Sequence, residues 1–181
     1  MRKVGVLVLL LVSVGMAGLA FHQYETSGRE VVRFPIAGAG EGAAPPVMLS
    51  RAQSPVRVIL SVRYRVDLVA DQNEAYGYQV SVKGPAGRTV LSGDGRNVVS
   101  REDRGSGFVT DRQNHVIGTF PVETEGAYLA EWSLSPRSGQ VLEARLMVRE
   151  NVAPISISKL TVAAICFVLA GLMLFAGRKR A

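Results

Sequence analysis

Three arginines, Arg57, Arg63 and Arg65, are the side chains whose type and spacing most favour a binding role. They occupy odd positions of the segment from Val56 to Leu68, in which apolar residues fill every even position. This period of two predicts a strand with one buried and one solvent-exposed face, and places the arginines on the exposed face. A row of guanidinium groups can dock on an acidic protein or on lipid headgroups. The simpler alternative is a solvated strand face, on which the arginines pair with Asp67 and with neighbours such as Glu131 or Glu143.

A second candidate for binding is the polar stretch from Ser92 to Gly107, in which only Val98 and Val99 are apolar. A segment with so little to bury cannot order itself by packing, so the sequence predicts a mobile loop with room for one short edge strand. Its charged side chains are the candidates for contacting a ligand: Asp94, Arg96, Arg101 and Arg104.

The residues that usually carry catalysis or bind metals do not form a recognisable pattern. His115 follows Asp111 by four residues, but a half-buried strand histidine is the better interpretation than a metal ligand. Ser106 lies between adjacent glycines, whereas a nucleophile elbow has its glycines two residues away on either side. We therefore predict no catalytic residue, no metal site and no cofactor, and we expect that the protein is not an enzyme.

Two apolar runs predict how the chain meets a membrane. Leu160 to Gly177 is eighteen residues long, carries no charge and is followed by Arg178-Lys179-Arg180. A helix of that length approaches the ~30 Å core of a bilayer, and the basic triplet marks its cytoplasmic end. Val4 to Phe21 is a second uncharged run. It is either a retained signal anchor or a cleaved signal peptide, and both alternatives export the middle of the chain.

The basic residues beside the two apolar runs explain the net charge of +6. Six of the 21 Lys and Arg lie beside the apolar runs, while all 15 Asp and Glu lie between His22 and Ser158. The middle segment is therefore neutral, and the basic composition is no argument for a nucleic-acid partner. The single cysteine, Cys166, lies in the last apolar run, so the middle segment has no disulfide of its own.

The middle segment reads as a series of short strands separated by turns such as Gly84–Gly87 and Ser135–Gly139. That spacing, without a helical period, predicts an all-β fold, an antiparallel β-sandwich flanked by N- and C-terminal transmembrane helices. We expect three parts: residues 1–21 as the anchor or signal peptide, 22–158 as the sandwich and 159–181 as the final helix with its basic tail. If both helices are retained, the first and last strands start and end at the membrane and can be neighbours in one sheet.

These expectations favour a non-enzymatic accessory or structural protein of the cytoplasmic (inner) membrane. Its β-sandwich would face the periplasmic, extracytoplasmic side and be presented to a membrane-protein partner, with the lipid bilayer as its other contact. The alternative is an extracytoplasmic module that binds an envelope glycan or a small solute through the stretch from Ser92 to Gly107.

Overall fold

The computed structural model describes residues 2–68, 72–100 and 107–175. The chain divides into two compact units. One is Gly28–Val152, and the other joins the first 27 residues to the segment that begins at Ala153. The predicted Arg101 and Arg104 lie outside the described residues.

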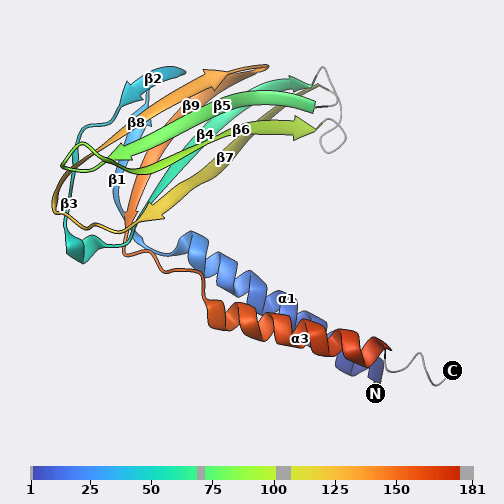
Figure 1. The fold of residues 1–181 in the computed structure, drawn as a ribbon. Helices are drawn as coiled ribbons and strands as arrows, with labels where there is room; N and C mark the ends of the chain where they lie inside the picture. The colour runs from blue at the N-terminus through green and yellow to red at the C-terminus, as the bar shows by residue number, and fades with distance from the viewer. Residues whose placement is uncertain (1, 69–71, 101–106, 176–181) are drawn as a thin grey trace. The chain divides into compact units, whose positions relative to one another are not determined.

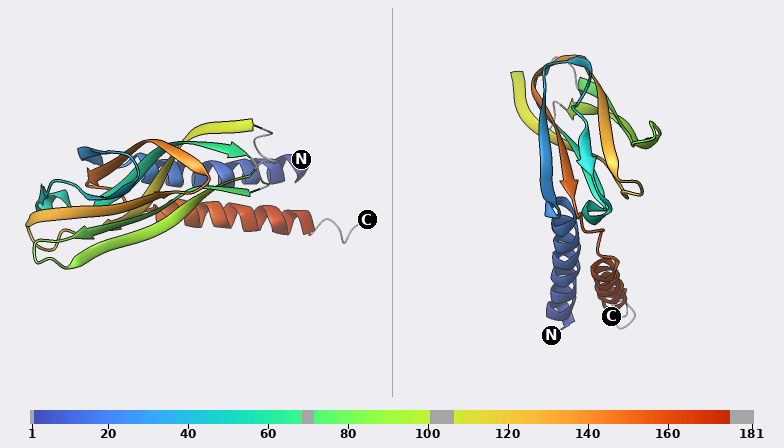
Figure 2. Two further views of the ribbon diagram at one scale, coloured as in Figure 1. Left: turned by 90° about the horizontal axis from the view of Figure 1, so that it is seen from above. Right: turned by 90° about the vertical axis from the view of Figure 1, so that its left-hand side faces the viewer.

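The unit Gly28–Val152 is a β-sandwich of two antiparallel sheets, seen as two layers in Figures 1 and 2. The first sheet has the order β1-β9-β4-β7 and consists of β1 (Arg29–Ile36), β9 (Gly139–Glu150), β4 (Val56–Leu68) and β7 (Gly107–Phe120). The second has the order β2-β8-β5-β6 and consists of β2 (Gly40–Ala43), β8 (Gly126–Pro136), β5 (Gln72–Lys83) and β6 (Thr89–Ser100). A short strand, β3 (Val47–Leu49), also pairs with β8, and a 3-10 turn, η1 (Arg51–Gln53), precedes β4.

The core between the sheets follows from the alternation in β4. Every even position from Val56 to Leu68 is buried, and these side chains meet residues of β9 and β5 such as Leu146 and Val80. Burying a side chain of this kind stabilises the fold by about 1.5–3 kcal/mol. The predicted antiparallel sandwich is therefore confirmed, with β4 as an interior strand of the first sheet.

The first and last strands of the sandwich are neighbours. β1 pairs with β9 in antiparallel register, from Arg29 opposite Glu150 to Ile36 opposite Ala144. This confirms the pairing expected from the positions of the two apolar runs. The segments that lead into and out of the sandwich therefore start from the same end of one sheet.

The prediction of a mobile loop from Ser92 to Gly107 is wrong for residues 92–100. They form most of β6, which pairs with β5 from Thr89 to Ser100. The glycines that suggested a loop are needed for packing. A Cβ at Gly95 would lie 2.7 Å from Tyr78 Oη, and one at Gly93 would lie 3.0 Å from Ile117 Cγ2. An edge strand also tolerates the charged side chains that lower its apolar content.

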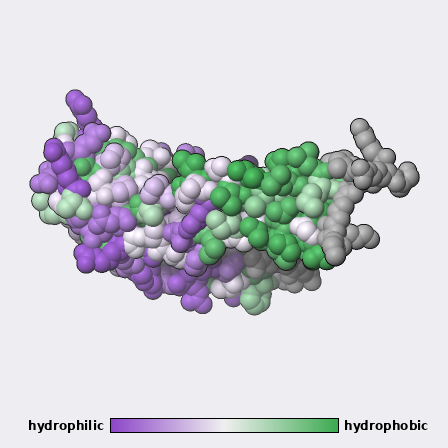
Figure 3. Space-filling view, turned by 90° about the horizontal axis from the view of Figure 1, so that it is seen from below, coloured by the Kyte–Doolittle hydropathy of each residue, from purple (hydrophilic) through white to green (hydrophobic). Residues whose placement is uncertain are grey.

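The second unit contains two antiparallel helices, α1 (Arg2–Thr26) and α3 (Ile157–Phe175) (Figure 1). Ser13 Oγ donates to the Ala163 carbonyl at 2.8 Å, and Lys159 Nζ donates to Gln23 Oε1. Ala20, Ala163 and Ala170 are buried along these helices, which lets their backbones approach closely. Both helices are long and apolar enough to cross a membrane, and Figure 3 shows the apolar surface that they present.

Candidate interaction surfaces

The outward face of the first sheet gathers arginines from all four of its strands. Directly paired residues of an antiparallel sheet share a face. The register places Arg63 of β4 opposite Arg112 of β7 and Glu143 of β9, and Arg57 opposite Arg149. We call this surface the arginine face. Its cationic members are Arg33, Arg57, Arg63, Arg65, Arg112, Arg145 and Arg149.

The prediction that Arg57 points to solvent is wrong. Arg57 is only 1% exposed, whereas Arg63 and Arg65 are exposed as predicted. Because β4 lies between β7 and β9, neighbours flank Arg57 on both sides, and its Nε donates to Thr119 Oγ1 at 3.4 Å. The outward Ile59 and Ser61 are buried at the same end of the strand. The exposed part of the arginine face therefore lies toward the other end of β4.

Ion pairs satisfy some of these guanidinium groups but not the central one. Arg112 Nη2 lies 2.9 Å from Glu143 Oε2, and Arg145 pairs with the other oxygen of the same carboxylate. Arg63, between the strands that carry these pairs, has no hydrogen bond or ion pair to any residue that the structure describes. A charge held at the surface without a partner remains available to an incoming anion.

Apolar side chains accompany the arginines on this surface. The Arg65 guanidinium carbon lies 3.9 Å from the ring centroid of Phe108, a cation–π contact. Phe108 is 61% exposed, and Val116, opposite Ile59 on the same face, is 43% exposed. The surface thus combines guanidinium groups with exposed apolar area.

Of the other predicted binding residues, the structure describes Asp94 and Arg96, and these two lie on the opposite side of the sandwich. Asp94 pairs with Gln79 and Arg96 with Gly77 on the outward face of the second sheet. Arg96 Nη1 lies 3.9 Å from Glu74 Oε2. Asp94 and Arg96 are therefore not brought together with Arg63 and Arg65, and the two pairs belong to two separate surfaces.

A hydrogen-bonded cluster lies between the sheets, around His115. Asn97 Nδ2 donates to Tyr76 Oη at 3.3 Å, so the hydroxyl proton is available to His115 Nε2, 2.7 Å away. The His115 ring is 4.4 Å from that of Tyr78, centroid to centroid. Burial lowers the pKa of His115 and raises the pKa of Tyr76. The interpretation of His115 as a half-buried strand residue is confirmed.

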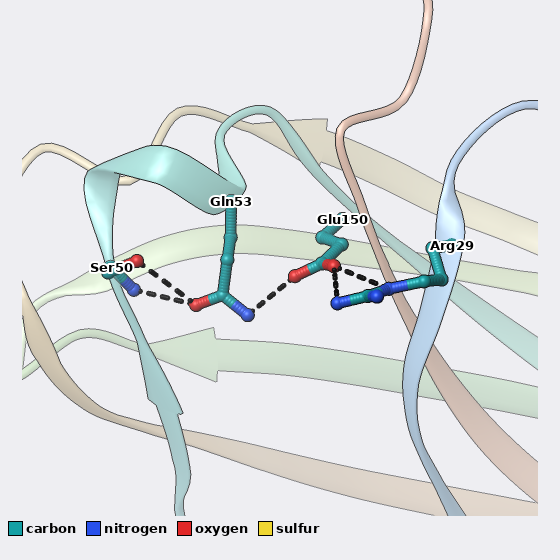
Figure 4. A network of polar contacts seen from close by, with 4 residues as sticks. All are labelled: Arg29, Ser50, Gln53 and Glu150. Atoms are coloured by element: carbon teal, nitrogen blue, oxygen red, sulfur yellow. Dashed lines mark hydrogen bonds and ion pairs between the residues drawn. The ribbon is translucent and has the colours of Figure 1, made fainter.

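A second polar cluster, shown in Figure 4, joins the ends of β1 and β9 to η1; we call it the base network. Gln53 Nε2 donates to Glu150 Oε2 at 2.6 Å, while Arg29 Nη2 lies 2.7 Å from Oε1 of the same carboxylate. The Ser50 backbone amide donates to Gln53 Oε1 at 2.8 Å and fixes the orientation of that amide group. The hydrogen bond from Gln53, followed by the contacts with Arg29, lowers the pKa of Glu150 although burial opposes this.

Sequence reasoning missed the base network, because its members are separated by up to 121 residues. Each of them alone is an ordinary strand-end or turn residue. The only available signal was the predicted pairing of the first and last strands, which places Arg29 opposite Glu150.

Comparisons with known proteins add likenesses of fold. No protein-family model matches the chain, and no curated protein matches it. The structure is similar to a chain of the T13 IBDV viral particle, at a TM-score of 0.39 and 11% identity; the match covers 68% of this chain and 32% of that one.

Two carbohydrate-binding modules are also similar. The C-terminal CBM6 of LamC from Zobellia galactanivorans matches at a TM-score of 0.29 and 13% identity, covering 68% of this chain and 94% of that one. The CBM22-1 xylan-binding domain of Paenibacillus barcinonensis Xyn10C matches at a TM-score of 0.28 and 12% identity, covering 71% of this chain and 98% of that one. Likenesses at these TM-scores carry no argument about what this chain does.

Proposed function

We propose that this protein is a non-enzymatic accessory protein of the cytoplasmic membrane, which presents its β-sandwich outside the cytoplasm to an acidic surface of a membrane-protein partner. The observation that carries the proposal is the arginine face, with the exposed Arg63 at its centre, which forms no ion pair with the part of the chain that the structure describes. Residues 22–158 carry 15 basic and 15 acidic residues, so this concentration of arginines on one sheet is a specific feature of the surface.

A protein partner is favoured over lipid headgroups by the composition of the face. Arginine and exposed aromatic side chains are enriched where protein interfaces bind most strongly, and Arg65 with Phe108 supplies such a pair. Glu143, held between Arg112 and Arg145, adds a carboxylate acceptor at a fixed position, which a donor on a complementary protein surface can match.

The helical unit supports the membrane part of the proposal. Both of its helices have the length and composition to span a bilayer, and they form an antiparallel pair. The segments that join them to the sandwich are short, since α1 ends at Thr26 and β1 begins at Arg29, while β9 ends at Glu150 and α3 begins at Ile157. Short joining segments favour a domain that works at the membrane surface.

The test is affinity purification of the tagged full chain in mild detergent, with mass spectrometry of the proteins that accompany it. We expect one stoichiometric membrane protein, retained by the wild type and lost from Arg63→Glu. Arg88→Glu is the matched control, because Arg88 is an exposed arginine of the β5–β6 turn, outside the arginine face. Both exposed substitutions should change the free energy of unfolding by no more than ~0.5 kcal/mol.

Two results would contradict the proposal. One is a wild-type protein that purifies without a stoichiometric partner. The other is a partner that binds Arg63→Glu as well as it binds the wild type. Release of the partner by raised salt, with the wild type, would be the expected sign of a surface-charge interaction.

A further inference from the structure

The outward face of the second sheet, opposite the arginine face, is hollowed. Two adjoining hollows of about 470 Å³ and 580 Å³ share Gln79 of β5 and Ser133 of β8. Both hollows are shallow and open to solvent, so a ligand held here would lie along the surface of the sheet. We call the combined surface the trough.

The trough follows from small side chains on two interior strands. Along β5 and β8 the outward pairs are Gly77 with Ser135, Gln79 with Ser133, and Ser81 with Glu131. Longer side chains line its two ends. Glu74, Arg96 and Arg137 line the first hollow, and Glu41 and Glu131 line the second.

The groups exposed in the trough determine which ligands it suits. β8 lies between β2 and β5, and β5 lies between β8 and β6, so their backbone amides and carbonyls are already paired. A peptide that adds to a sheet needs an unpaired edge, which this floor does not offer. A ligand here meets side-chain hydroxyl, amide, carboxylate and guanidinium groups. Tyr78 and Trp132 also border the hollows, but they pack against the core.

The charges of the trough disfavour an anionic ligand. Glu74 lies between two cations, with Arg137 Nε at 3.7 Å and Arg96 Nη1 at 3.9 Å from its carboxylate oxygens. At the other end, Lys83 Nζ lies 2.7 Å from Glu131 Oε1, and Glu41 adds a further negative charge. A phosphate-rich polymer needs an excess of cations, which this surface lacks.

We infer that the trough binds a neutral oligosaccharide chain. Such a chain carries hydroxyl groups along its whole length, and these both donate to carboxylates and accept from amides and guanidinium groups. Two adjoining hollows suit an extended ligand of several sugar units. This inference does not rest on the proposed accessory function, since the trough and the arginine face lie on different sheets.

The test is isothermal titration of the full chain with four neutral hexasaccharides: cellohexaose, xylohexaose, mannohexaose and hexa-N-acetylchitohexaose. The protein is held in lauryldimethylamine oxide, because a detergent with a sugar headgroup would compete for the site. We expect at least one of the four to bind with a dissociation constant below about 1 mM. Hexagalacturonate, which carries carboxylates, should bind at least about tenfold more weakly than the best neutral chain.

Two variants and one control assign the binding to the trough. Gln79→Ala removes the amide shared by both hollows, and Gly77→Leu fills the floor; each should weaken binding at least about tenfold. A Cβ at Gly77 would lie 3.7 Å from the Gly95 carbonyl oxygen, an ordinary contact, so the fold should tolerate the change. Asn114→Leu adds the same side chain to an exposed position of the arginine face and should leave affinity unchanged.

The inference is overturned if none of the four hexasaccharides binds the wild type. It is also overturned if binding occurs but Gln79→Ala, checked to melt at the wild-type temperature, binds as tightly as the wild type. If Gly77→Leu does not fold, Gln79→Ala alone decides where the ligand is held. Loss of partner binding in Arg63→Glu with sugar binding intact would separate the two surfaces.

Discussion

Glu150 is 4% exposed, and a carboxylate so enclosed destabilises a fold unless it is hydrogen-bonded and paired. Gln53 and Arg29 provide both contacts and lower its pKa, so the folded state binds a proton less readily than the unfolded state. Stability from this group is therefore present above the ordinary glutamate pKa and is lost as pH falls through the lowered value. We expect the wild-type melting temperature to fall in acid, and Glu150→Gln to melt lower at neutral pH with a smaller acid dependence.

The measurement is thermal unfolding followed by circular dichroism from neutral pH to about pH 3. Glu30→Gln is the control, because Glu30 forms an ion pair with Arg33 on an exposed part of the surface. Exposed ion pairs contribute little to stability, so the melting temperature of this variant should match that of the wild type at every pH measured. If the melting temperature of Glu150→Gln falls in acid as steeply as that of the wild type, the base network does not determine the loss of stability at low pH.

The Tyr76 hydroxyl takes part in both hydrogen bonds of the cluster between the sheets, one with Asn97 and one with His115. Removing its hydroxyl in Tyr76→Phe leaves Asn97 Nδ2 and His115 Nε2 without the partner that both use. An unsatisfied buried polar group costs about 1–3 kcal/mol, so the free energy of unfolding should fall by that amount in urea titrations. Tyr64→Phe, at the neighbouring ring 5.3 Å away, is the control and should change it by less.

His115 gives the sandwich a second pH dependence, at higher pH than that of Glu150. Burial lowers its pKa below the ordinary value of 6.5, so the unfolded state binds the proton more readily. Stability should be fully present above the ordinary pKa and should fall as pH drops below it. Protonation also turns Nε2 into a donor, which competes with the Tyr76 hydroxyl proton. His115→Gln should remove the loss of stability just below the ordinary histidine pKa. The loss at lower pH that is assigned to Glu150 should remain.

Among the elements, β4 and β6 show what a sequence can and cannot reveal. The alternation of β4 is visible because the positions that face the core all carry large apolar side chains. In β6 the inward positions include Gly93 and Gly95, which are small because Ile117 and Tyr78 occupy the space. That reason appears only when another strand is in place. Arg57 is a similar case, because its burial depends on the neighbours of β4 and not on its own strand.

The paired helices depend on small side chains along their contact. Ser13 is 8% exposed, and its hydroxyl donates to the Ala163 carbonyl. Ser13→Leu removes the hydrogen bond and forces the helices apart, which should weaken their association by about 1–2 kcal/mol. Val14→Leu is the control, because Val14 is an exposed neighbour on the same helix.

The association can be measured by cross-linking cysteines placed at Gly5 and Met173, in a Cys166→Ser background. A Cβ at Gly5 would lie 3.3 Å from Met173 Cε, so a short thiol-reactive cross-linker can span the two positions. The cross-linked fraction should fall in Ser13→Leu and persist in Val14→Leu. Equal fractions in both variants would mean that Ser13 is not a close contact.

At the scale of the whole chain, the sequence predicted the sandwich and the pairing of its first and last strands, but not how charge is distributed over it. Counting residues gives a neutral middle segment, and the strand register then assigns arginines of four strands to a single face. Arg63 and Arg65 could be predicted from one strand alone. Arg112 and Arg145 could not be assigned to the same surface, because this requires knowing which strands β4 pairs with.

The antiparallel helices predict where the two ends of the chain lie. An antiparallel pair that spans a bilayer places the start of α1 and the end of α3 on the same side, and the flanking Lys and Arg favour the cytoplasm. In a Cys166→Ser background, Glu41→Cys in β2 should react with a membrane-impermeant maleimide in intact cells. Peptide tags added to either end should be digested by protease only after the membrane is opened. Digestion of one tag in intact cells would contradict the two-helix topology, and cleavage of the first helix would show as loss of the N-terminal tag from the mature protein.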